Sequence, residues 1–358
     1  NRRIVSTMKF RDTSAWYHLV AVFDKNNSTS TDRMKMYVNG ERITSFSDTG
    51  NWPSDTSQMN NDSLGRPHEI GCINSNDFFD GVMSHIHFCD GYAYTPSDFG
   101  SVDSVTGEWK INTSPSVSYG TTGYWILKDG NTVTDSSANS NAWTVAAGTL
   151  TKTEDCPSNV FATLNPLWTL ESSRVPTLTL GNNMFSAGGS ATWYQTIATL
   201  GFTSGKYYWE AKYNAGTNLG KNLVGVVSID DMGTGTFYGQ TPALFYRNED
   251  GGEYILNNSV TTADYGTLAQ NDILGFAIDM DAGTPTATFY KNGSALVSNI
   301  SLTNFAGKTI VPAVSTYQSG EFQMNFGNGY FGTTAVSSAG TNASGNGIFE
   351  YNVPTGYT

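Results

Sequence analysis

The chain is short of charged residues and of long apolar runs, and each shortage excludes a class of protein. Charged residues make up 14% of its 358 residues, and 19 Lys and Arg stand against 31 Asp and Glu, a formal net charge of −12. A nucleic-acid binder needs clustered Lys and Arg to neutralise phosphates, so we expect no nucleic acid among the partners. No 18-residue apolar run occurs, so we expect no membrane insertion.

Cysteine is scarce as well. Its three residues, Cys72, Cys89 and Cys156, cannot build a disulfide framework. We therefore expect buried thiols in a chain that folds in a reducing cytosol. The chain begins with Asn1 and has no signal peptide at its start, so we expect a segment of a longer protein or a processed product.

Glycine, small polar residues and aromatics are abundant. The chain has 38 Gly, and its 38% hydrophobic and 13% aromatic residues suffice for real cores. No stretch of ten or more residues shows a convincing 3.6-residue apolar period. These features predict an all-β protein of short antiparallel strands with few or no long helices, and the length favours two domains.

Residues 271–297 carry the clearest local signal. Four apolar residues alternate with smaller or polar ones: Leu274, Phe276, Ile278 and Met280. After a turn at 281–283, a second strand ends at Asn292-Gly293, which favours a type I′ hairpin because both positions adopt positive φ readily. Residues 34–43 contain the same Tyr-x-Asn-Gly ending, which indicates two copies of one kind of β-sandwich.

The predicted organisation has four parts. They are a first β-sandwich over 1–150, a linker over 151–166, a second β-sandwich over 167–331, and a flexible tail or connector over 332–358. In the first part we expect a central strand at 16–23, a helical turn at 95–99, and closing strands at 123–127 and 142–145. The small polar residues of 332–347 suggest the flexible connector, and residues 349–354 either dock back as a last strand or lead into a further segment.

Five blocks in the second region resemble the SPRY (B30.2-like) domain. They are Gly205-Lys-Tyr-Tyr-Trp-Glu210, Val224-Gly-Val226, Asp272-Ile-Leu-Gly-Phe-Ala-Ile-Asp279, Thr288-Phe-Tyr-Lys-Asn-Gly293, and Val311-Pro-Ala-Val314 followed by Asn325-Phe-Gly327. Their order along the second region makes the resemblance specific, and it implies a concanavalin A-like jelly-roll sandwich.

The first region resembles the laminin-G/concanavalin A-like module. The carriers are Trp16-Tyr-His-Leu-Val20, Met36-Tyr-Val-Asn-Gly40, Ile70-Gly71 and Phe79-Asp-Gly81. That module normally has several strands before the one at Trp16, so we expect missing N-terminal strands or strands supplied by a neighbouring chain. Four further blocks are similar to laminin-G-like plus SPRY proteins of tailed marine bacteriophages and cyanophages. They are Phe10-Arg-Asp-Thr-Ser-Ala-Trp-Tyr-His18, His87-Phe-Cys-Asp-Gly91, Thr95-Pro-Ser-Asp-Phe-Gly100 and Asn159-Val-Phe-Ala-Thr-Leu-Asn-Pro166.

This resemblance implies a non-enzymatic structural protein of the virion, synthesised in the host cytoplasm. We expect a module of a tail fibre or other appendage that adheres to a host-surface glycan or protein, contacts other virion proteins and forms a homo-oligomer. One alternative is a capsid-decorating, head-fibre or assembly protein. Another is a polysaccharide-degrading enzyme, because concanavalin A-like sandwiches also host glucanases.

The sequence offers no catalytic residues. A glycosidase needs two carboxylates about 5 to 10 Å apart, and no E-x-D-x-x-E run occurs. Asp279 and Asp281 have a suitable spacing, but their place at a strand end indicates a turn. No G-x-S-x-G nucleophile elbow is present either.

Two metal sites can be considered. His85, His87 and Cys89 would share one face of a strand, as zinc ligands could, with His68 or His18 completing the set. The alternative is a half-buried strand with hydrogen-bonded imidazoles. Calcium is the one cofactor that we retain as a candidate, because laminin-G-like modules often bind it at a loop rim. The candidate ligands are Asp24, Asp32, Asp77 and Asp80, although acidic loops are ordinary in so acidic a chain.

The candidate partner-binding residues lie in predicted loops of the second sandwich. Function resides disproportionately on loops held by a rigid scaffold, and Tyr, Trp and Arg anchor interfaces or stack on sugars. The candidates are Trp193, Tyr194, Phe237, Tyr238, Tyr246, Arg247 and Tyr317. The alternative for each aromatic is a place in the core or at a strand edge.

Overall fold

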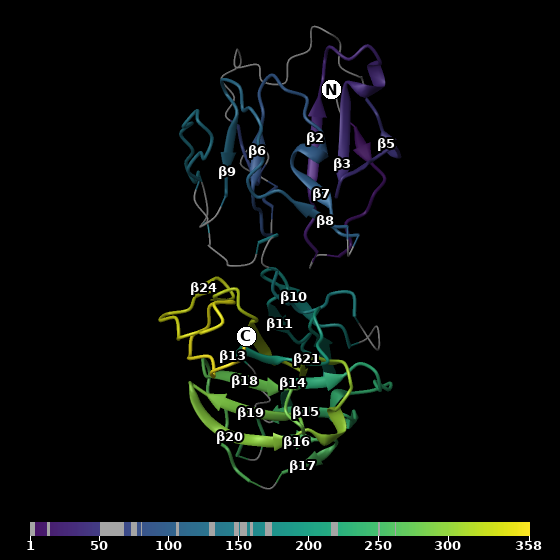
Figure 1. The fold of residues 1–358 in the computed structure, drawn as a ribbon. Helices are drawn as coiled ribbons and strands as arrows, with labels where there is room; N and C mark the ends of the chain where they lie inside the picture. Colours follow the sequence, from purple (N-terminus) through teal and green to yellow (C-terminus); the bar gives the residue numbers. More distant parts are fainter. Residues whose placement is uncertain are drawn as a thin grey trace. The chain divides into compact units, whose positions relative to one another are not determined.

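The computed structural model of the protein describes two compact β units. The described residues are 4–12, 15–50, 68–72, 77–79, 81–104, 107–128, 133–146, 150, 156–157, 160–168, 174–215, 221–249, 251–261 and 263–358. One unit comprises 1–11, 15–152 and 156–158, and the other 12–14, 153–155 and 159–358. Throughout the described ranges the regular elements are strands and short 3₁₀ turns, which confirms the all-β prediction (Figure 1).

Among its described residues, the first unit contains four small antiparallel sheets. Three of them have two strands each: β1 (Val5–Ser6) with β5 (Phe46–Asp48), β6 (Ile86–Phe88) with β9 (Tyr124–Ile126), and β7 (Gly100–Val102) with β8 (Trp109–Ile111). The fourth has three strands in the order β2 (Leu19–Phe23), β3 (Met34–Val38) and β4 (Glu41–Arg42). A small core forms where β6 meets β9: Ile126 and Leu127 are buried there, and Trp143 packs against the ring of Tyr124 at 4.6 Å.

Two expectations for this unit are wrong and one is confirmed. Over 16–23, β2 begins only at Leu19 and lies at the edge of its sheet in the described part of the chain, because Leu19 is 62% exposed and only Val22 is buried. Over 142–145 the chain is not a strand, since Trp143 turns inward onto β9. The 3₁₀ turn η3 (Pro96–Asp98) is where predicted, and the Asp98 carboxylate accepts the Thr95 N–H at 2.7 Å.

The second unit packs two antiparallel sheets face to face. The seven-stranded sheet has the order β10 (Thr177–Thr179), β11 (Met184–Ser186), β22 (Glu321–Asn325), β13 (Lys206–Ala215), β18 (Ile273–Asp279), β19 (Thr286–Lys291) and β20 (Ser294–Ser301). The six-stranded sheet has the order β12 (Trp193–Ile197), β21 (Ile310–Tyr317), β14 (Asn222–Ser228), β15 (Ala243–Arg247), β16 (Glu253–Leu256) and β17 (Ser259–Val260). The remaining elements are η6 (Phe237–Gly239), η7 (Thr303–Phe305), β23 (Tyr330–Phe331) and β24 (Thr334–Ala335).

The core of this unit is the layer between its two sheets. Because side chains alternate across a strand, every second residue of each strand enters this layer. The largest of these side chains are essentially inaccessible to water: Phe185, Tyr213, Tyr246, Phe276, Phe289 and Phe322. Trp209 stacks on Phe276 with ring centroids 5.3 Å apart, and each such buried ring contributes about 2 to 3 kcal/mol.

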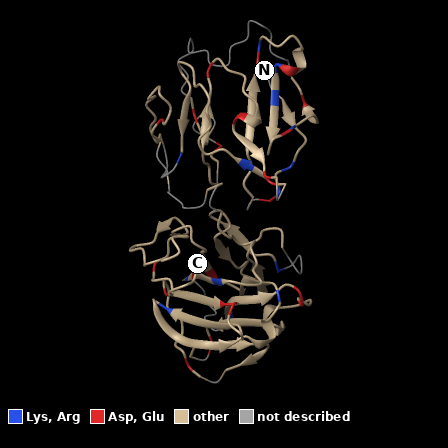
Figure 2. Ribbon diagram, viewed as in Figure 1, with Lys and Arg blue, Asp and Glu red and all other residues tan. Residues whose placement is uncertain are grey.

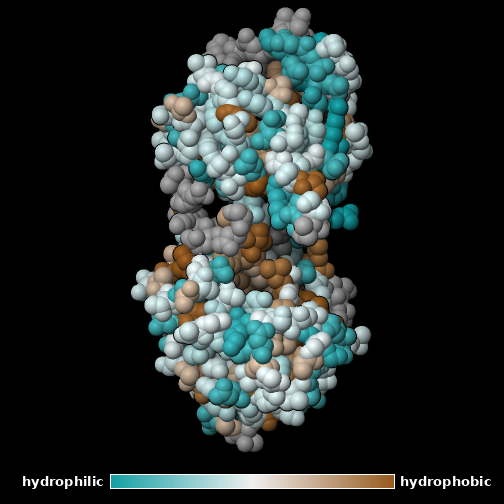
Figure 3. All heavy atoms as spheres, in the orientation of Figure 1, coloured by the Kyte–Doolittle hydropathy of each residue, from teal (hydrophilic) through white to brown (hydrophobic). Residues whose placement is uncertain are grey.

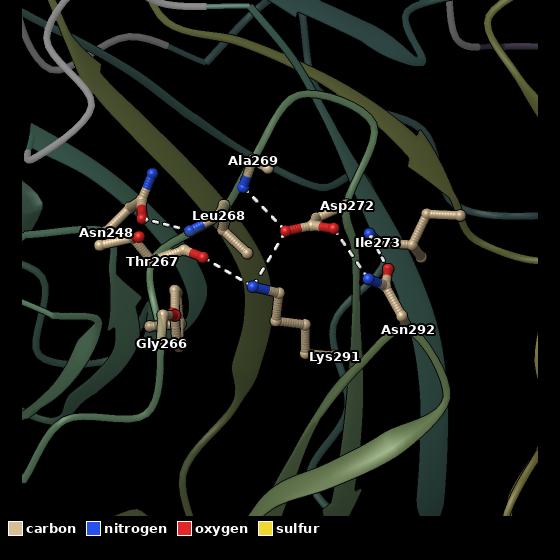
Figure 4. Close-up of polar contacts among 10 residues, drawn as sticks. Asn248, Gly266, Thr267, Leu268, Ala269, Asp272, Ile273, Lys291 and Asn292 are labelled. Atoms are coloured by element: carbon tan, nitrogen blue, oxygen red, sulfur yellow. Dashed lines mark hydrogen bonds and ion pairs between the residues drawn. The ribbon is translucent and has the colours of Figure 1, made fainter.

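The predicted hairpin occupies one side of the seven-stranded sheet. Asn292 and Gly293 have φ of 49° and 78°, as a type I′ turn requires, so the prediction is confirmed. The Asn292 side chain accepts the Ile273 N–H at 2.9 Å and donates to Asp272 at 2.8 Å. Lys291 donates to Asp272 at 3.0 Å and to the Thr267 carbonyl at 2.6 Å, so the turn is fastened to the loop before β18 (Figure 4).

The C-terminal segment, expected to be a flexible tail, is instead folded against the seven-stranded sheet. Its Phe349 and Val353 are 2% and 8% exposed and pack with Tyr208 and Ala277 of the sheet (Figure 1, yellow). At its end, the Tyr208 N–H donates to the Thr358 carbonyl at 2.9 Å. The composition of 332–347 predicts flexibility because the anchoring side chains, Phe349, Val353 and Tyr357, lie beyond the small-residue run.

A buried carboxylate fixes this segment. Glu210 on β13 is fully buried, and its two oxygens accept the backbone N–H groups of Glu350 and Tyr351, each at 2.9 Å. The Tyr208 hydroxyl and the Asn325 amide donate to the same carboxylate at 3.1 and 3.3 Å. Burial raises the pKa of Glu210 to about 7, against the lowering effect of these four hydrogen bonds.

Replacing Glu210 should therefore loosen the C-terminal segment. Glu210→Ala leaves two backbone N–H groups buried without acceptors, and we expect the free energy of unfolding to fall by about 1 to 3 kcal/mol. Hydrogen exchange of the Glu350 and Tyr351 amides should accelerate. The matched control is Glu321→Ala, whose carboxylate accepts only side-chain donors. Equal acceleration of those two amides in both variants would contradict the assignment.

Candidate functional site

The outer face of the six-stranded sheet is the surface on which the sequence candidates converge. Paired residues of neighbouring strands point to the same side, and Trp193 pairs with Tyr317 across β12 and β21. Leu223 of β14 pairs with Ser315 of β21 and with Arg247 of β15. Ser315 lies two residues before Tyr317 on the same strand, and alternate residues of a strand point to the same side. All of these side chains therefore lie on the side away from the inter-sheet core.

A long loop, residues 229–242, covers the middle of this outer face. Its Phe237 is fully buried and stacks on Phe245 of β15 at 5.7 Å and on Trp168 at 5.4 Å. The Gln195 side chain donates to the Gly235 carbonyl at 2.8 Å and accepts the Phe237 N–H at 3.0 Å. One glutamine on the sheet thus holds the main chain of the loop in place.

The uncovered end of the face carries a row of aromatic and cationic side chains, here called the rim strip and defined as Trp193, Lys221, Tyr238, Arg247 and Tyr317. Trp193 and Tyr317 meet edge to face at 5.7 Å, and the Lys221 ammonium lies 4.4 Å from the Tyr317 ring centre. The Arg247 guanidinium lies 5.8 Å from the Tyr238 ring. The strip therefore joins the strands β12, β15 and β21, the residue just before β14, and the covering loop.

The two cations of the rim strip differ in their surroundings. Arg247 pairs with Glu253 at 3.0 Å and with Glu249, and its side chain is only 14% exposed. Lys221 is exposed, and no carboxylate pairs with it among the residues that the structure describes. Charged residues are thinly spread along the strands and loops of both units (Figure 2), and the surface in view is mainly hydrophilic or intermediate in hydropathy (Figure 3).

Three of the seven predicted contact residues are buried, which corrects their expected role. Tyr194 and Tyr246 are 7% and 1% exposed because they lie on the inner side of β12 and β15, where sequence analysis expected loops. Phe237 is buried beneath its own loop. The other four, Trp193, Tyr238, Arg247 and Tyr317, belong to the rim strip. Lys221 was missed, because only the register of β14 against β21 brings it to Tyr317.

Gln195 gives a test of the covering loop. Gln195→Ala removes both hydrogen bonds to the loop, so we expect the free energy of unfolding to fall by about 1 to 3 kcal/mol and the Phe237 amide to exchange faster with solvent. Gln270→Ala, an exposed glutamine outside this face, serves as the control. Unchanged exchange at Phe237 in the Gln195 variant would show that the ring stacking alone holds the loop.

The calcium candidates do not come together in the described structure. Asp24 accepts hydrogen bonds from Asn26 and Asn27, Asp32 pairs with Arg42, and Asp77 is exposed in a separate loop. Asp80 lies outside the described residues. Over the described ranges no three His, Cys, Asp or Glu side chains are grouped so that they could hold a metal ion.

The zinc candidates are likewise engaged elsewhere. His87 Nδ1 lies 2.9 Å from the Tyr119 hydroxyl, and its ring stacks on Trp125 at 5.0 Å. His85 lies 2.7 Å from the Ser84 hydroxyl, and its φ of 51° takes it out of the strand. His18 accepts the Trp109 indole N–H at 2.9 Å.

We expect His87 to make the first unit sensitive to acid. Burial, with smaller contributions from His85 and His18, lowers its pKa from 6.5 to about 4. Between these values the unfolded chain binds more protons than the folded one, so stability is full above pH 6.5 and falls as the pH drops toward 4. Hydrogen exchange of residues 86–88 and 124–126 should accelerate over this window.

The matched variants for that experiment are His87→Asn and His68→Gln. The first removes the buried titrating ring and should flatten the pH dependence between 6.5 and 4, whereas the second changes an exposed histidine and should leave it intact. An unchanged slope in the His87 variant would assign the acid sensitivity to other groups.

Asp279 and Asp281, whose spacing would suit a catalytic carboxylate pair, instead stabilise a turn. Asp279 accepts the N–H groups of Asp281 and Ala282 at 2.9 and 3.0 Å and pairs with Lys206 at 2.8 Å. Asp281 accepts the Gly205 N–H at 2.6 Å. Desolvation acts to raise the pKa of Asp279, but the hydrogen bond from Lys206 and those of the turn hold it below its usual value. Both carboxylates are thus committed to structure.

Comparison with known proteins defines the class of each unit. Residues 206–329 match the profile of the SPRY domain, and residues 1–99 match that of the concanavalin A-like lectin/glucanases superfamily, Laminin_G_3. The chain therefore contains a laminin-G-like domain and a SPRY domain, two β-sandwich classes that typically serve as binding modules. None of the described helical turns has the length and hydropathy of a membrane span.

Solved SPRY structures match part of the chain at low identity. The SPRY domain of human HERC1 is 22% identical, with a TM-score of 0.34, and the match covers 40% of this chain and 87% of that one. The TRIM65 PSpry domain is 15% identical, with a TM-score of 0.36 and coverages of 46% and 88%. A human SPRY domain is 20% identical, with a TM-score of 0.32 and coverages of 40% and 90%. No curated protein matches the chain.

Proposed function

We propose that the chain is a non-enzymatic binding protein whose SPRY domain recognises its partner through the rim strip. The observation that carries this proposal is the set of aromatic and cationic side chains that three strands, the start of β14 and one fastened loop hold at one end of a sheet face. Such side chains supply large contact area at low entropic cost, and rigid strands limit the ordering needed on binding.

The setting that we propose is a virion. Its support is the similarity of residues 10–18, 87–91, 95–100 and 159–166 to laminin-G-like plus SPRY proteins of tailed phages. On a homo-oligomeric tail fibre or appendage, many weak contacts of the rim strip with a host-surface glycan or protein would add up to firm adhesion. The proposed contact needs no cofactor, because it relies on ring faces and ammonium groups alone.

Adhesion by the rim strip can be tested with variants of the multimerised full chain. Trp193→Ala and Tyr317→Ala should each weaken adsorption to host cells by about 30-fold, as loss of a central interface anchor does. Tyr92→Ala changes an aromatic side chain that is 50% exposed in the other unit and should leave adsorption unchanged. Equal adsorption of all three variants, with unchanged thermal unfolding, would overturn the role of the strip.

Imaging distinguishes a tail appendage from the alternative setting. That alternative is a capsid-decorating, head-fibre or assembly protein that binds other virion proteins. Particles labelled with a gold-conjugated antibody against the SPRY domain should carry gold on the tail or its appendages. Gold on the head would favour the alternative, and particles without gold would contradict a virion role.

A further inference from the structure

We propose that the rim strip binds a carboxylated sugar, such as a uronic acid residue, with Lys221 holding the carboxylate and the Trp193–Tyr317 pair receiving the ring. This inference rests on the proposed binding function and names the chemistry of the ligand. It follows from the different surroundings of Lys221 and Arg247, from the geometry of the Trp193 and Tyr317 rings, and from the net charge of the whole chain.

Lys221 is the cation of the strip that can accept a new anion. The guanidinium of Arg247 already faces Glu249 and Glu253, so an added carboxylate there would be repelled by two existing ones. The Lys221 ammonium has no carboxylate partner in the described part of the chain and is held instead over the Tyr317 ring, 4.4 Å from its centre. It is thus positioned, charged and exposed.

The neighbouring rings suit a saccharide. Trp193 and Tyr317 are paired positions at the ends of β12 and β21, and they meet at 5.7 Å with their planes 69° apart. Their Cα atoms are fixed by the sheet, and each side chain is partly exposed. The C–H faces of a pyranose stack on such rings, and in a hexuronic acid the carboxylate is attached to the same ring that stacks. One sugar residue can therefore satisfy both an aromatic side chain and the nearby ammonium.

The net charge of the chain makes a local cation necessary. With a formal charge of −12, the protein as a whole repels an anion. A neutral sugar would need only the rings, whereas an acidic sugar needs a cation that is not already neutralised. Lys221 meets this requirement at the same place as the rings, and this coincidence favours the acidic ligand.

The test compares one polysaccharide backbone with and without its charge. Oligogalacturonate and its methyl ester differ only in the carboxylate, so the full chain should bind the acid form about tenfold more tightly, as a charged hydrogen bond provides. Lys221→Met should abolish this preference by weakening the binding of the acid form about tenfold. Trp193→Ala should weaken both forms. Binding is measured by isothermal titration calorimetry.

Lys128→Met is the matched control, because the Lys128 ammonium lies 4.4 Å from the Trp125 ring in the other unit and copies the contact of Lys221 with Tyr317. It should keep the full preference. The inference is overturned if neither oligosaccharide binds, if acid and ester bind equally, if Lys221→Met retains the preference, or if a polyglutamate peptide of the same charge binds as tightly as oligogalacturonate. If one of these results is found but the rim-strip variants still lose adsorption to cells, the proposed binding function holds and only the proposed ligand is wrong.

Discussion

The second unit depends on one constraint, the burial of a continuous aromatic and aliphatic layer between two antiparallel sheets. Within this layer Trp209 stacks on Phe276, and Phe276 meets Phe289 edge to face. The alternation of side chains decides what each strand presents on its other face. A shift of one residue in β12 would bring Tyr194 outside and Trp193 into the core. The composition of the rim strip is thus a consequence of the register that fills the core.

Different segments of the chain cover the outer faces of the two sheets. On the six-stranded sheet, a loop covers the centre and leaves the end open, with Gln195 bonding the loop backbone. On the seven-stranded sheet, the C-terminal segment covers the region around Tyr208, and Glu210 bonds its backbone. In both cases a polar side chain rising from the sheet satisfies main-chain groups that would otherwise be buried without partners. The open end of the six-stranded face is where exposed aromatic and cationic side chains remain.

Local sequence signals were sufficient for much of the framework. The Asn292-Gly293 turn, the helical turn at Pro96 and the strands of the SPRY blocks depend on neighbours within a few residues, so pattern and propensity predict them. The same reasoning was less reliable for the binding residues. The expectation that partner contacts lie on loops predicts loops at Tyr194 and Tyr246, yet both residues lie on strands, where pairing across the sheet outweighs local preference.

The sequence by itself determined that this protein is all-β, that Asn-Gly turns close two hairpins, and that laminin-G-like and SPRY sandwiches follow one another. These properties are encoded by residues close together in the chain. Only the tertiary structure decided which aromatics face solvent, that Lys221 meets Tyr317, and that Glu210 binds a segment 140 residues away. The physical reason is that such contacts depend on strand register and on the path of covering segments, which are set by how the whole core fills its space.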